Sequence, residues 1–427
     1  MSTAAVTAAA SSGGGVGLRR MLASNIMARL AALVALAAAT VMVARLGGPD
    51  LVGGFTLLRV LPGIAGVLAA AGLPGAAPYF LSGRSEDRSL RSTLVLLTLT
   101  GATLGMLAWL VLTPVLHQLF FKTWAVGLTV ACGGAVFSQL FLAVGKALLQ
   151  GGGDLPGANV AIVAEEVVYL PVYLALIPAG HGLGPVLIAL IASDILVAAG
   201  IAERLRRRGF FTNWARPSRR LAIEISAYGT RGQLGGLMSL INLRLDVAIL
   251  GAMAGPGVLG VYAIASKYAE LLRLPGLAVT YVLYPVFSRH GHRAATERTR
   301  ALIPRAFWFT VASAIPLALA AGVVLPVLYG TSFDGAIHPT WILLFGLLTE
   351  GVAGLITAYL YGIGRPGLNS LAVGAGVVVT VVGDFALIPH LGVIGASVAS
   401  AAAYLATTLT LVVCFHRIER SDHETTR

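Results

Sequence analysis

The sequence predicts an all-α polytopic membrane protein whose twelve transmembrane helices form two parallel six-helix bundles around a central cavity. Three observations predict this fold class. Hydrophobic residues make up 57% of the 427 residues and charged residues only 11%, with a mean hydropathy of +0.85, so the polar surface is too small for a soluble chain of this length. Apolar stretches that can cross a hydrocarbon core of about 30 Å recur along the chain. The second half of the chain also repeats features of the first half.

Twelve apolar stretches are long enough to span the membrane. They cover residues 22–44, 51–73, 92–113, 124–146, 157–178, 183–203, 222–250, 257–287, 304–328, 339–361, 367–388 and 392–415. The first stretch follows two arginines, as in a secretory signal, but its length and its counterpart in the second half favour a retained first helix. Prolines inside spans predict kinks or breaks, which are tolerated where a helix lines a cavity or packs on a neighbour. These prolines are Pro62, Pro171, Pro275 and Pro316.

The spans divide the chain into five segments. We expect a disordered cytoplasmic tail at 1–21, an N-terminal six-helix bundle at 22–203, a basic cytoplasmic linker at 204–221, a C-terminal six-helix bundle at 222–416 and a cytoplasmic tail at 417–427. Basic residues gather in the tails and in the loops after even-numbered spans, whereas the loops after odd-numbered spans contain only Arg45 and Lys122. The positive-inside rule therefore predicts a multi-pass protein of the cytoplasmic (inner) cell membrane with both termini in the cytoplasm.

The two halves share sequence features at a nearly constant spacing. Gly48-Pro49 and Gly53 recur 207 residues later as Gly255-Pro256 and Gly260. Near an offset of 210 residues, Pro156-Gly157-x-Asn159 recurs as Pro366-Gly367-x-Asn369. This order and spacing indicate an internal duplication, which is typical of transporters. Because six spans return the chain to its starting side, the two repeats must be parallel.

Several basic residues lie inside apolar spans and are candidate substrate-binding residues. They are Arg29, Arg59, Arg231, Lys267 and Arg273. A charge near the bilayer centre costs roughly 2.5 to 3.5 kcal/mol, so we expect these side chains to line a hydrated cavity. Arg29 lies near the cytoplasmic end of its span, where its side chain can alternatively reach the interface.

Acidic residues inside the spans are candidates for ion coupling or for counter-ions of the buried bases. They are Glu165, Asp194, Glu270, Glu350 and Asp384. A buried carboxyl group can bind and release a proton, which allows coupling to H⁺ or Na⁺, but pairing with a buried base is the commoner role. Glu270 lies three residues from both Lys267 and Arg273, on the same helical face, which favours the counter-ion role.

The sequence contains no pattern for catalysis or cofactor binding. It lacks a Ser/His/Asp cluster, a phosphate-binding glycine loop and a nucleotide motif, and Cys132 and Cys414 have no metal-ligand spacing. We therefore expect neither an enzyme nor a metal or cofactor site. The net charge of +12 follows from the cytoplasmic loops rather than from a nucleic-acid-binding region. The short loops also argue against a membrane glycan polymerase, which needs an extramembrane catalytic region.

Several segments resemble the multidrug/oligosaccharidyl-lipid/polysaccharide (MOP) exporter superfamily, in particular its polysaccharide transporter branch of Wzx-type flippases. Three are Arg-Leu-Asp-Val-Ala-Ile-Leu-Gly at 244–251, Gly-Val-Leu-Gly-Val-Tyr-Ala-Ile-Ala at 257–265 and Leu-Tyr-Pro-Val-Phe-Ser-Arg at 283–289. Two later ones are Leu-Tyr-Gly-Ile-Gly-Arg-Pro-Gly-Leu-Asn at 360–369 and Leu-Ile-Pro-His-Leu-Gly-Val-Ile-Gly-Ala-Ser-Val-Ala-Ser at 387–400.

The resemblance implies a V-shaped pair of lobes around a cationic cavity. It also implies alternating-access transport of a polyprenyl-diphosphate-linked oligosaccharide, or a related lipid-linked glycan, for cell-surface polysaccharide biosynthesis. The five bases would then bind the diphosphate. Tyrosines are candidates for stacking on sugars, although packing between helices is their commoner role. They are Tyr169, Tyr173, Tyr228, Tyr262 and Tyr268.

Two alternatives remain open at this point. A multidrug or cation antiporter of the same superfamily has the same number of helices but needs an acidic cavity. A non-transporting membrane partner of cell-wall synthesis needs no cavity. The main interpretation implies a polyprenyl-linked glycan as substrate, membrane lipids as surroundings and glycan-assembly proteins as partners, and transport driven by H⁺, Na⁺ or the membrane potential.

Overall fold

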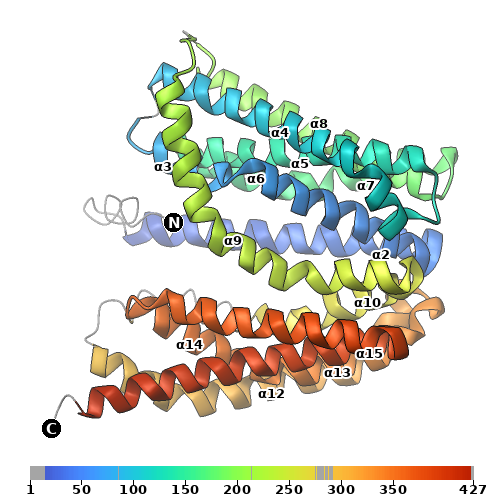
Figure 1. Cartoon of the computed structure of the whole chain (residues 1–427), viewed down its shortest axis with the longest axis vertical. Coiled ribbons are helices and arrows are strands. Elements are labelled where there is room, and N and C mark those ends of the chain that lie inside the picture. Colours follow the sequence, from blue (N-terminus) through green and yellow to red (C-terminus); the bar gives the residue numbers. More distant parts are fainter. Residues whose placement is uncertain are drawn as a thin grey trace. The chain divides into compact units, whose positions relative to one another are not determined.

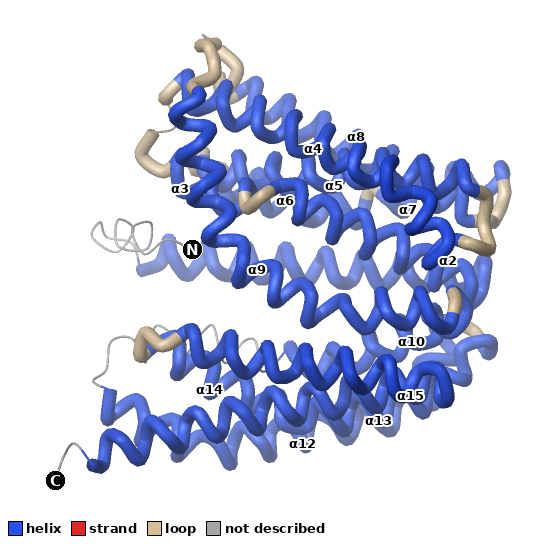
Figure 2. Tube along the Cα trace, in the orientation of Figure 1, coloured by secondary structure: helices blue, strands red, loops and turns tan. Residues whose placement is uncertain are grey.

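The protein is a helical membrane protein built from two compact units. The computed structural model describes residues 15–84, 86–212, 214–274, 276, 283, 287 and 292–424, and all regular secondary structure within them is helical (Figure 2). The first unit comprises the chain up to Leu46 together with Leu57–Leu237, and the second comprises Gly47–Thr56 together with the chain from Met238. Figure 1 shows the helices in the order of the sequence.

The first unit is organised around one central helix. Its helices are most of α2 (Gly15–Ala70), α3 (Leu73–Leu81), α4 (Arg88–Leu116), the π-helical turn η1 (His117–Phe121), α5 (Val126–Gly151), α6 (Leu155–Val167), α7 (Tyr169–Leu176), the short η2 (Ile177–Ala179), α8 (Leu183–Arg207) and the first half of α9 (Arg219–Ala254). Helix α5 contacts α3, α4, α6 and α8. Its buried Leu140 and Leu148 pack in one cluster with Phe80, Leu94 and Ile201.

The second unit has its own apolar core. It contains the second half of α9, α10 (Pro256–Ala269), the 3₁₀ turn η3 (Glu270–Leu272), α12 (His292–Tyr329), η4 (Thr331–Ala336), α13 (Ile337–Gly346), η5 (Leu347–Thr349), α14 (Glu350–Gly362) and α15 (Pro366–Glu424). Helix α14 packs against α12 and α15, and α13 packs against α10 and α15. The buried Tyr359 ring lies edge-on to the Phe415 ring, 5.2 Å away, at the centre of this core.

Helix lengths agree with the predicted spans. Eight described segments are long and apolar enough to cross a membrane. Two of them, α2 and α15, each join two predicted spans at a glycine in the left-handed region, Gly48 (φ 62°) and Gly392 (φ 53°), where the chain reverses (Figure 1). The spans predicted at 222–250 and 257–287 correspond to α9 and to α10 with η3, and residues 275, 277–282 and 284–286 of the latter lie outside the described residues.

Several spans are broken along their length. The span predicted at 157–178 divides into α6 and α7 around Val168, because Pro171 lacks the N–H that would bond to the Val167 carbonyl. Helix α10 tightens into η3 at Glu270, and η5 separates α13 from α14 although no proline predicts a break there. Helices α2 and α12 continue through Pro62 and Pro316, because one lost hydrogen bond can bend a membrane helix without ending it. Pro275 lies outside the described residues.

The boundary between the units departs from the one expected at 204–221. Residues Arg219–Leu237 belong to the first unit, because the backbone of Gly229 packs directly on Gly72 and the Tyr228 ring stacks on Tyr79 at 4.4 Å. Helix α8 ends at Arg207 and α9 begins at Arg219, so the connection is shorter than predicted. Helix α2 begins at Gly15 and α15 continues to Glu424, so both predicted tails are partly helical.

Candidate functional site

The first unit holds a cluster of charged side chains at the break between α6 and α7. Arg59 of α2 donates through Nη2 to Glu166 Oε1 at 2.5 Å, and Lys146 of α5 pairs with Glu165. Glu165 and Glu166 are the two residues before the last residue of α6. Because they are adjacent, their side chains point to different partners. The side chains of Arg59 and Lys146 are each 24% exposed. Two ion pairs therefore lie beside a broken membrane helix.

Asp194 of α8 adds a third carboxylate to this cluster. It is buried, and its Oδ2 accepts a 2.6 Å hydrogen bond from Ser138 Oγ of α5. The cluster thus contains three acids, Glu165, Glu166 and Asp194, but only two bases. This balance differs from the predicted cationic cavity, because both bases already have an acidic partner.

The other two predicted cations of the first unit lie away from this cluster. Arg29 is exposed, and its Nε donates to Asn25 Oδ1 at 3.0 Å. The Asn25 amide in turn donates to Asn159 Oδ1 at 2.8 Å, which joins the first and fifth spans. Arg231 is exposed on α9 and belongs to the first unit rather than to the C-terminal bundle.

The second unit places its charged pair where two helix breaks meet. Arg273, directly after η3, donates through Nε to Glu350 Oε1 at 3.2 Å, and Glu350 directly follows η5. The Arg273 guanidinium also lies over the Tyr404 ring of α15, 5.5 Å from its centroid. A Cβ atom added to Gly276 would lie 3.3 Å from the Glu350 carbonyl oxygen, so a small residue allows the two segments to approach.

Lys267 and Glu270 lie one to two turns from this pair. Lys267 Nζ is 5.7 Å from the centroid of the Phe55 ring. Phe55 lies in the segment Gly47–Thr56 of α2, which belongs to the second unit. Glu270 begins η3, three residues before Arg273. Glu270 therefore stays within one turn of Arg273, as predicted for a counter-ion. The acid that pairs with Arg273 is Glu350.

The second unit also contains two buried aspartates, Asp246 and Asp384. Asp246 of α9 accepts a hydrogen bond from Tyr262 of α10, whose hydroxyl also lies 2.9 Å from Ser400 Oγ of α15. Asp384 of α15 is fully buried, and neither of its carboxylate oxygens has a hydrogen-bond partner among the described residues. A buried carboxyl group in this state is expected to be protonated or to bind a cation.

The tyrosines predicted as stacking candidates mostly pack between helices. Tyr169 and Tyr173 are fully buried and stack on each other with ring centroids 5.6 Å apart. Tyr262 and Tyr268 are buried and hydrogen-bonded, the latter to the Leu317 carbonyl. Tyr228 is exposed, but its ring already lies against Tyr79. In this structure these tyrosines thus contact other parts of the protein, as in the alternative of helix packing.

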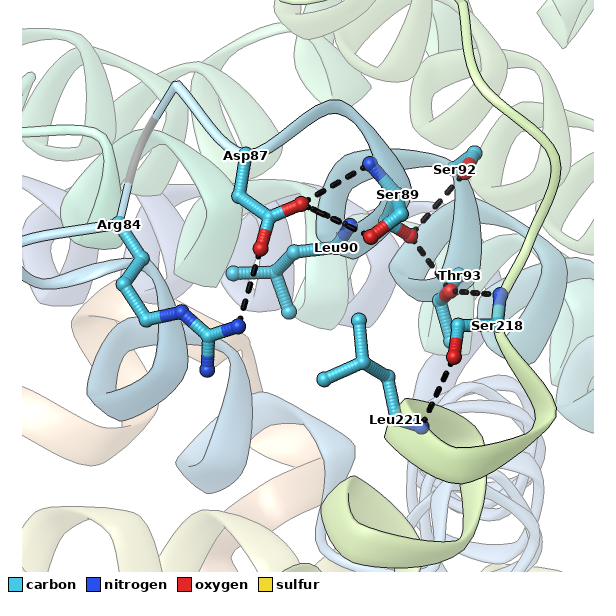
Figure 3. Close-up of polar contacts among 8 residues, drawn as sticks. All are labelled: Arg84, Asp87, Ser89, Leu90, Ser92, Thr93, Ser218 and Leu221. Atoms are coloured by element: carbon cyan, nitrogen blue, oxygen red, sulfur yellow. Dashed lines mark hydrogen bonds and ion pairs between the residues drawn. The ribbon is translucent and has the colours of Figure 1, made fainter.

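Two carboxylates outside the spans fasten the ends of helices. Asp154 caps α6 by accepting from Gly157 N, and it also pairs with Arg204 and Arg208 of the α8 end. The hydrogen bond from Arg204 lowers the pKa of Asp154 although burial opposes this. Asp87 caps α4 through Ser89 N and Leu90 N (Figure 3). Its partial burial raises its pKa, but these hydrogen bonds and Arg84 outweigh it, and the pKa is lowered overall.

Lys146 and Tyr404 are site residues that the sequence did not reveal. Lys146 was placed at the end of the span predicted at 124–146, but α5 continues to Gly151, which brings Lys146 inside the helix and next to Glu165. The three glycines at 151–153, which end α5, were the available signal. Tyr404 had no such signal, because only the packing of helices far apart in sequence brings its ring to Arg273.

An anion that binds Arg59 or Arg273 has to compete with a carboxylate. An arginine offers a planar set of donors that binds phosphate oxygens as well as carboxylates. A diphosphate that reached Arg59 or Arg273 would displace Glu166 or Glu350. The released carboxylate would then be left without its charged partner in a poorly solvated place.

Solved structures of two transporters share this fold. The chain superposes on the lipid II flippase MurJ in an inward closed conformation with a TM-score of 0.74 and 15% identity, covering 92% of this chain and 87% of that one. It superposes equally, with a TM-score of 0.74 and 20% identity, on an inward-facing multidrug resistance MATE family transporter of the MOP superfamily, covering 94% and 99%. A curated relative is the probable low-salt glycan biosynthesis flippase Agl15 of Haloferax volcanii, 22% identical over 366 residues, 85% of this chain and 76% of that protein.

The chain is a polytopic helical membrane protein, and these superpositions show that it shares its fold with both transporters. The family described as polysaccharide biosynthesis protein matches residues 42–338. The chain belongs to this family, which confirms the resemblance found in the sequence.

Proposed function

We propose that this protein is a flippase that moves a polyprenyl-diphosphate-linked oligosaccharide, or a related lipid-linked glycan, across the cytoplasmic membrane by alternating access. Membership of the polysaccharide biosynthesis family and the similarity to Agl15 support this proposal. The single observation that carries it is the placement of Arg59 and Arg273 at helix breaks, each held by one carboxylate. Such arginines are fixed in position yet can exchange partners.

The structure supports an exchange mechanism for substrate binding. The diphosphate would take over the donors of Arg273 from Glu350, and in the first unit those of Arg59 from Glu166. Lys267 would contribute as a point charge and Arg29 at the cytoplasmic entrance. Protonation of the displaced carboxylate would then couple transport to H⁺. Asp384, buried without a partner among the described side chains, is the second candidate for carrying H⁺ or Na⁺.

The membrane potential provides a further driving force. A diphosphate with about two negative charges that leaves an inside-negative cytoplasm gains roughly 4 to 5 kcal/mol at 100 mV. The proposed orientation, with both termini in the cytoplasm, makes this the productive direction. The arginines of the α8–α9 connection support this orientation. Labelling of single cysteines placed at residues 208 and 181 in intact cells tests it. Glycan-assembly proteins on either side of the membrane would supply and consume the substrate.

The proposal is tested by measuring flipping of a fluorescent polyprenyl-diphosphate-linked oligosaccharide in liposomes. Arg59→Gln and Arg273→Gln should each lower the rate about a hundredfold, since each removes a charge-assisted contact worth roughly 1.5 to 3 kcal/mol. Arg293→Gln is the matched control, because this exposed arginine pairs with Glu297, one turn away on the surface of the same helix. Unchanged flipping in both folded variants would contradict the proposal.

Export of cationic compounds is a second candidate function. The surplus of acids in the first unit, together with Asp246 and Asp384 in the second, favours it. The two functions separate in one experiment, because an exporter of cations extrudes ethidium from vesicles in an Asp194-dependent manner. A flippase transports the lipid-linked glycan and leaves ethidium unmoved. A non-transporting partner of cell-wall synthesis would do neither.

A further inference from the structure

The connection between α8 and α9 is held firmly against the start of α4. Arg91 Nη1 donates to the Gly209 carbonyl at 2.8 Å, and its guanidinium lies over the buried Phe210 ring, 5.4 Å from the centroid. Ser218 N donates to Thr93 Oγ1 at 2.9 Å (Figure 3). Phe211 and Trp214 therefore lie on a connection that is fixed on both sides of them.

Two aromatic rings on this connection face outward. Phe211 is 37% and Trp214 50% exposed, and their ring centroids lie 6.1 Å apart. Phe210, their neighbour, is buried in the core of the first unit. Exposed aromatic rings at the ends of two membrane-spanning helices are typical of side chains that sit at the level of lipid headgroups.

Six exposed arginines surround these rings. Arg206, Arg207 and Arg208 end α8 and precede the rings, and Arg216, Arg219 and Arg220 follow them into α9. Glu203 pairs with Arg206 and Arg207, and Asp154 pairs with Arg208. Arg216, Arg219 and Arg220 form no ion pair with the described side chains, and the exposed Glu224 is the acid nearest to them along the chain. We call these six arginines together with Phe211 and Trp214 the linker face.

We propose that the linker face binds anionic phospholipid headgroups at the membrane surface. The occupant follows from charge complementarity: several arginines spread along the end of two spans match the many phosphates of a lipid surface, whereas one diphosphate needs only one or two. The exposed rings beside them suit the boundary between headgroups and acyl chains. This inference goes beyond the proposed transport function and does not depend on which molecule is transported.

Trp214 provides a local reporter for this interaction. A variant that keeps Trp214 and replaces the other four tryptophans by Phe is placed in nanodiscs of phosphatidylcholine with 30 mol% of a second lipid carrying brominated acyl chains. Brominated phosphatidylglycerol should quench the fluorescence more than brominated phosphatidylcholine. Replacing Arg216, Arg219 and Arg220 by Gln should lower the preference for phosphatidylglycerol by roughly tenfold or more, since each arginine near an anionic surface contributes about fivefold.

The matched control removes equal charge elsewhere. Replacing Arg293, Arg298 and Arg300 by Gln changes three exposed arginines of the second unit, and should leave the quenching of Trp214 unchanged. Thermal unfolding of each variant verifies the fold. Equal quenching by the two brominated lipids, or a preference unaffected by the triple replacement, overturns the proposal. A Trp214 response to farnesyl diphosphate in pure phosphatidylcholine nanodiscs, without any response to phosphatidylglycerol, also overturns it and assigns the face to the substrate.

Discussion

At the residue scale, three ion pairs neutralise charged side chains inside the spans. Arg59 pairs with Glu166, Lys146 with Glu165 and Arg273 with Glu350. Pairing lowers the cost of placing a charge at this depth, but a buried pair adds little stability over apolar residues, whereas removal of one partner is costly.

Replacing one member of the Arg273–Glu350 pair should destabilise the protein more than replacing both. Glu350→Gln leaves the Arg273 charge without its partner and should destabilise the protein by about 2 to 3 kcal/mol. The double variant Arg273→Gln, Glu350→Gln should lose less, because no charge is left unpaired. Thermal unfolding in detergent measures both, and a double variant that is less stable than either single variant would rule out direct pairing.

Asp154 should make stability depend on acidic pH. Its pKa is lowered in the folded protein by Arg204, so its contribution is present above the unfolded pKa of about 3.9 and is lost as the pH falls through the lower folded pKa. Asp154→Asn should therefore be less stable than the parent at pH 6, and this difference should shrink below pH 4. The exposed Glu86→Gln serves as the control, and a difference that stays constant with pH would contradict the assignment.

At the element scale, the repeated Gly-Pro motif forms a reciprocal contact. A Cβ on Gly53 would lie 1.9 Å from the Pro256 carbonyl oxygen, and a Cβ on Gly260 would lie 1.9 Å from the Pro49 carbonyl oxygen. Each glycine thus packs on the proline of the other repeat, so the two repeats contact each other through equivalent residues. The contact also explains why residues 47–56 pack with the second unit.

Replacing either glycine by alanine should destabilise the protein. Gly53→Ala and Gly260→Ala force backbone segments apart and should each destabilise the protein by about 1 to 3 kcal/mol. Gly127→Ala, where nothing lies within 4 Å of the added atom, should cost nothing. Unfolding in detergent distinguishes them, and equal stability of all three variants would contradict the close packing.

At the scale of the whole molecule, each unit has its own core. The helix breaks at Val168, at η3 and at η5 have charged residues beside them in each unit, and the proposed transport of a diphosphate would move negative charge across the membrane. We predict that flipping in liposomes accelerates severalfold when an inside-negative potential of 100 mV is imposed in the direction of export. A valinomycin-induced potassium potential provides the measurement, with Arg293→Gln protein as control. A rate indifferent to the potential would exclude this driving force.

The sequence alone determined the features that depend on local composition and spacing. Apolar length predicted the membrane spans, because crossing a bilayer requires a minimum number of apolar residues. The spacing of Gly48-Pro49 and Gly255-Pro256 predicted the repeat, and Pro171 predicted a break in the fifth span. The resemblance to the family rested on five short segments between residues 244 and 400. Ionisable residues inside spans could also be found by inspection, since charge in an apolar run is rare.

Only the tertiary structure decided which of these residues meet. The pairing of Arg59 with Glu166 rather than Glu165, of Arg273 with Glu350 rather than Glu270, and the place of Lys146 within α5 all depend on how helices rotate and pack. Assignment of Arg231 to the first unit likewise depends on Gly229 fitting against Gly72. A side chain's partner is set by contacts between segments far apart in sequence, and no local pattern records them.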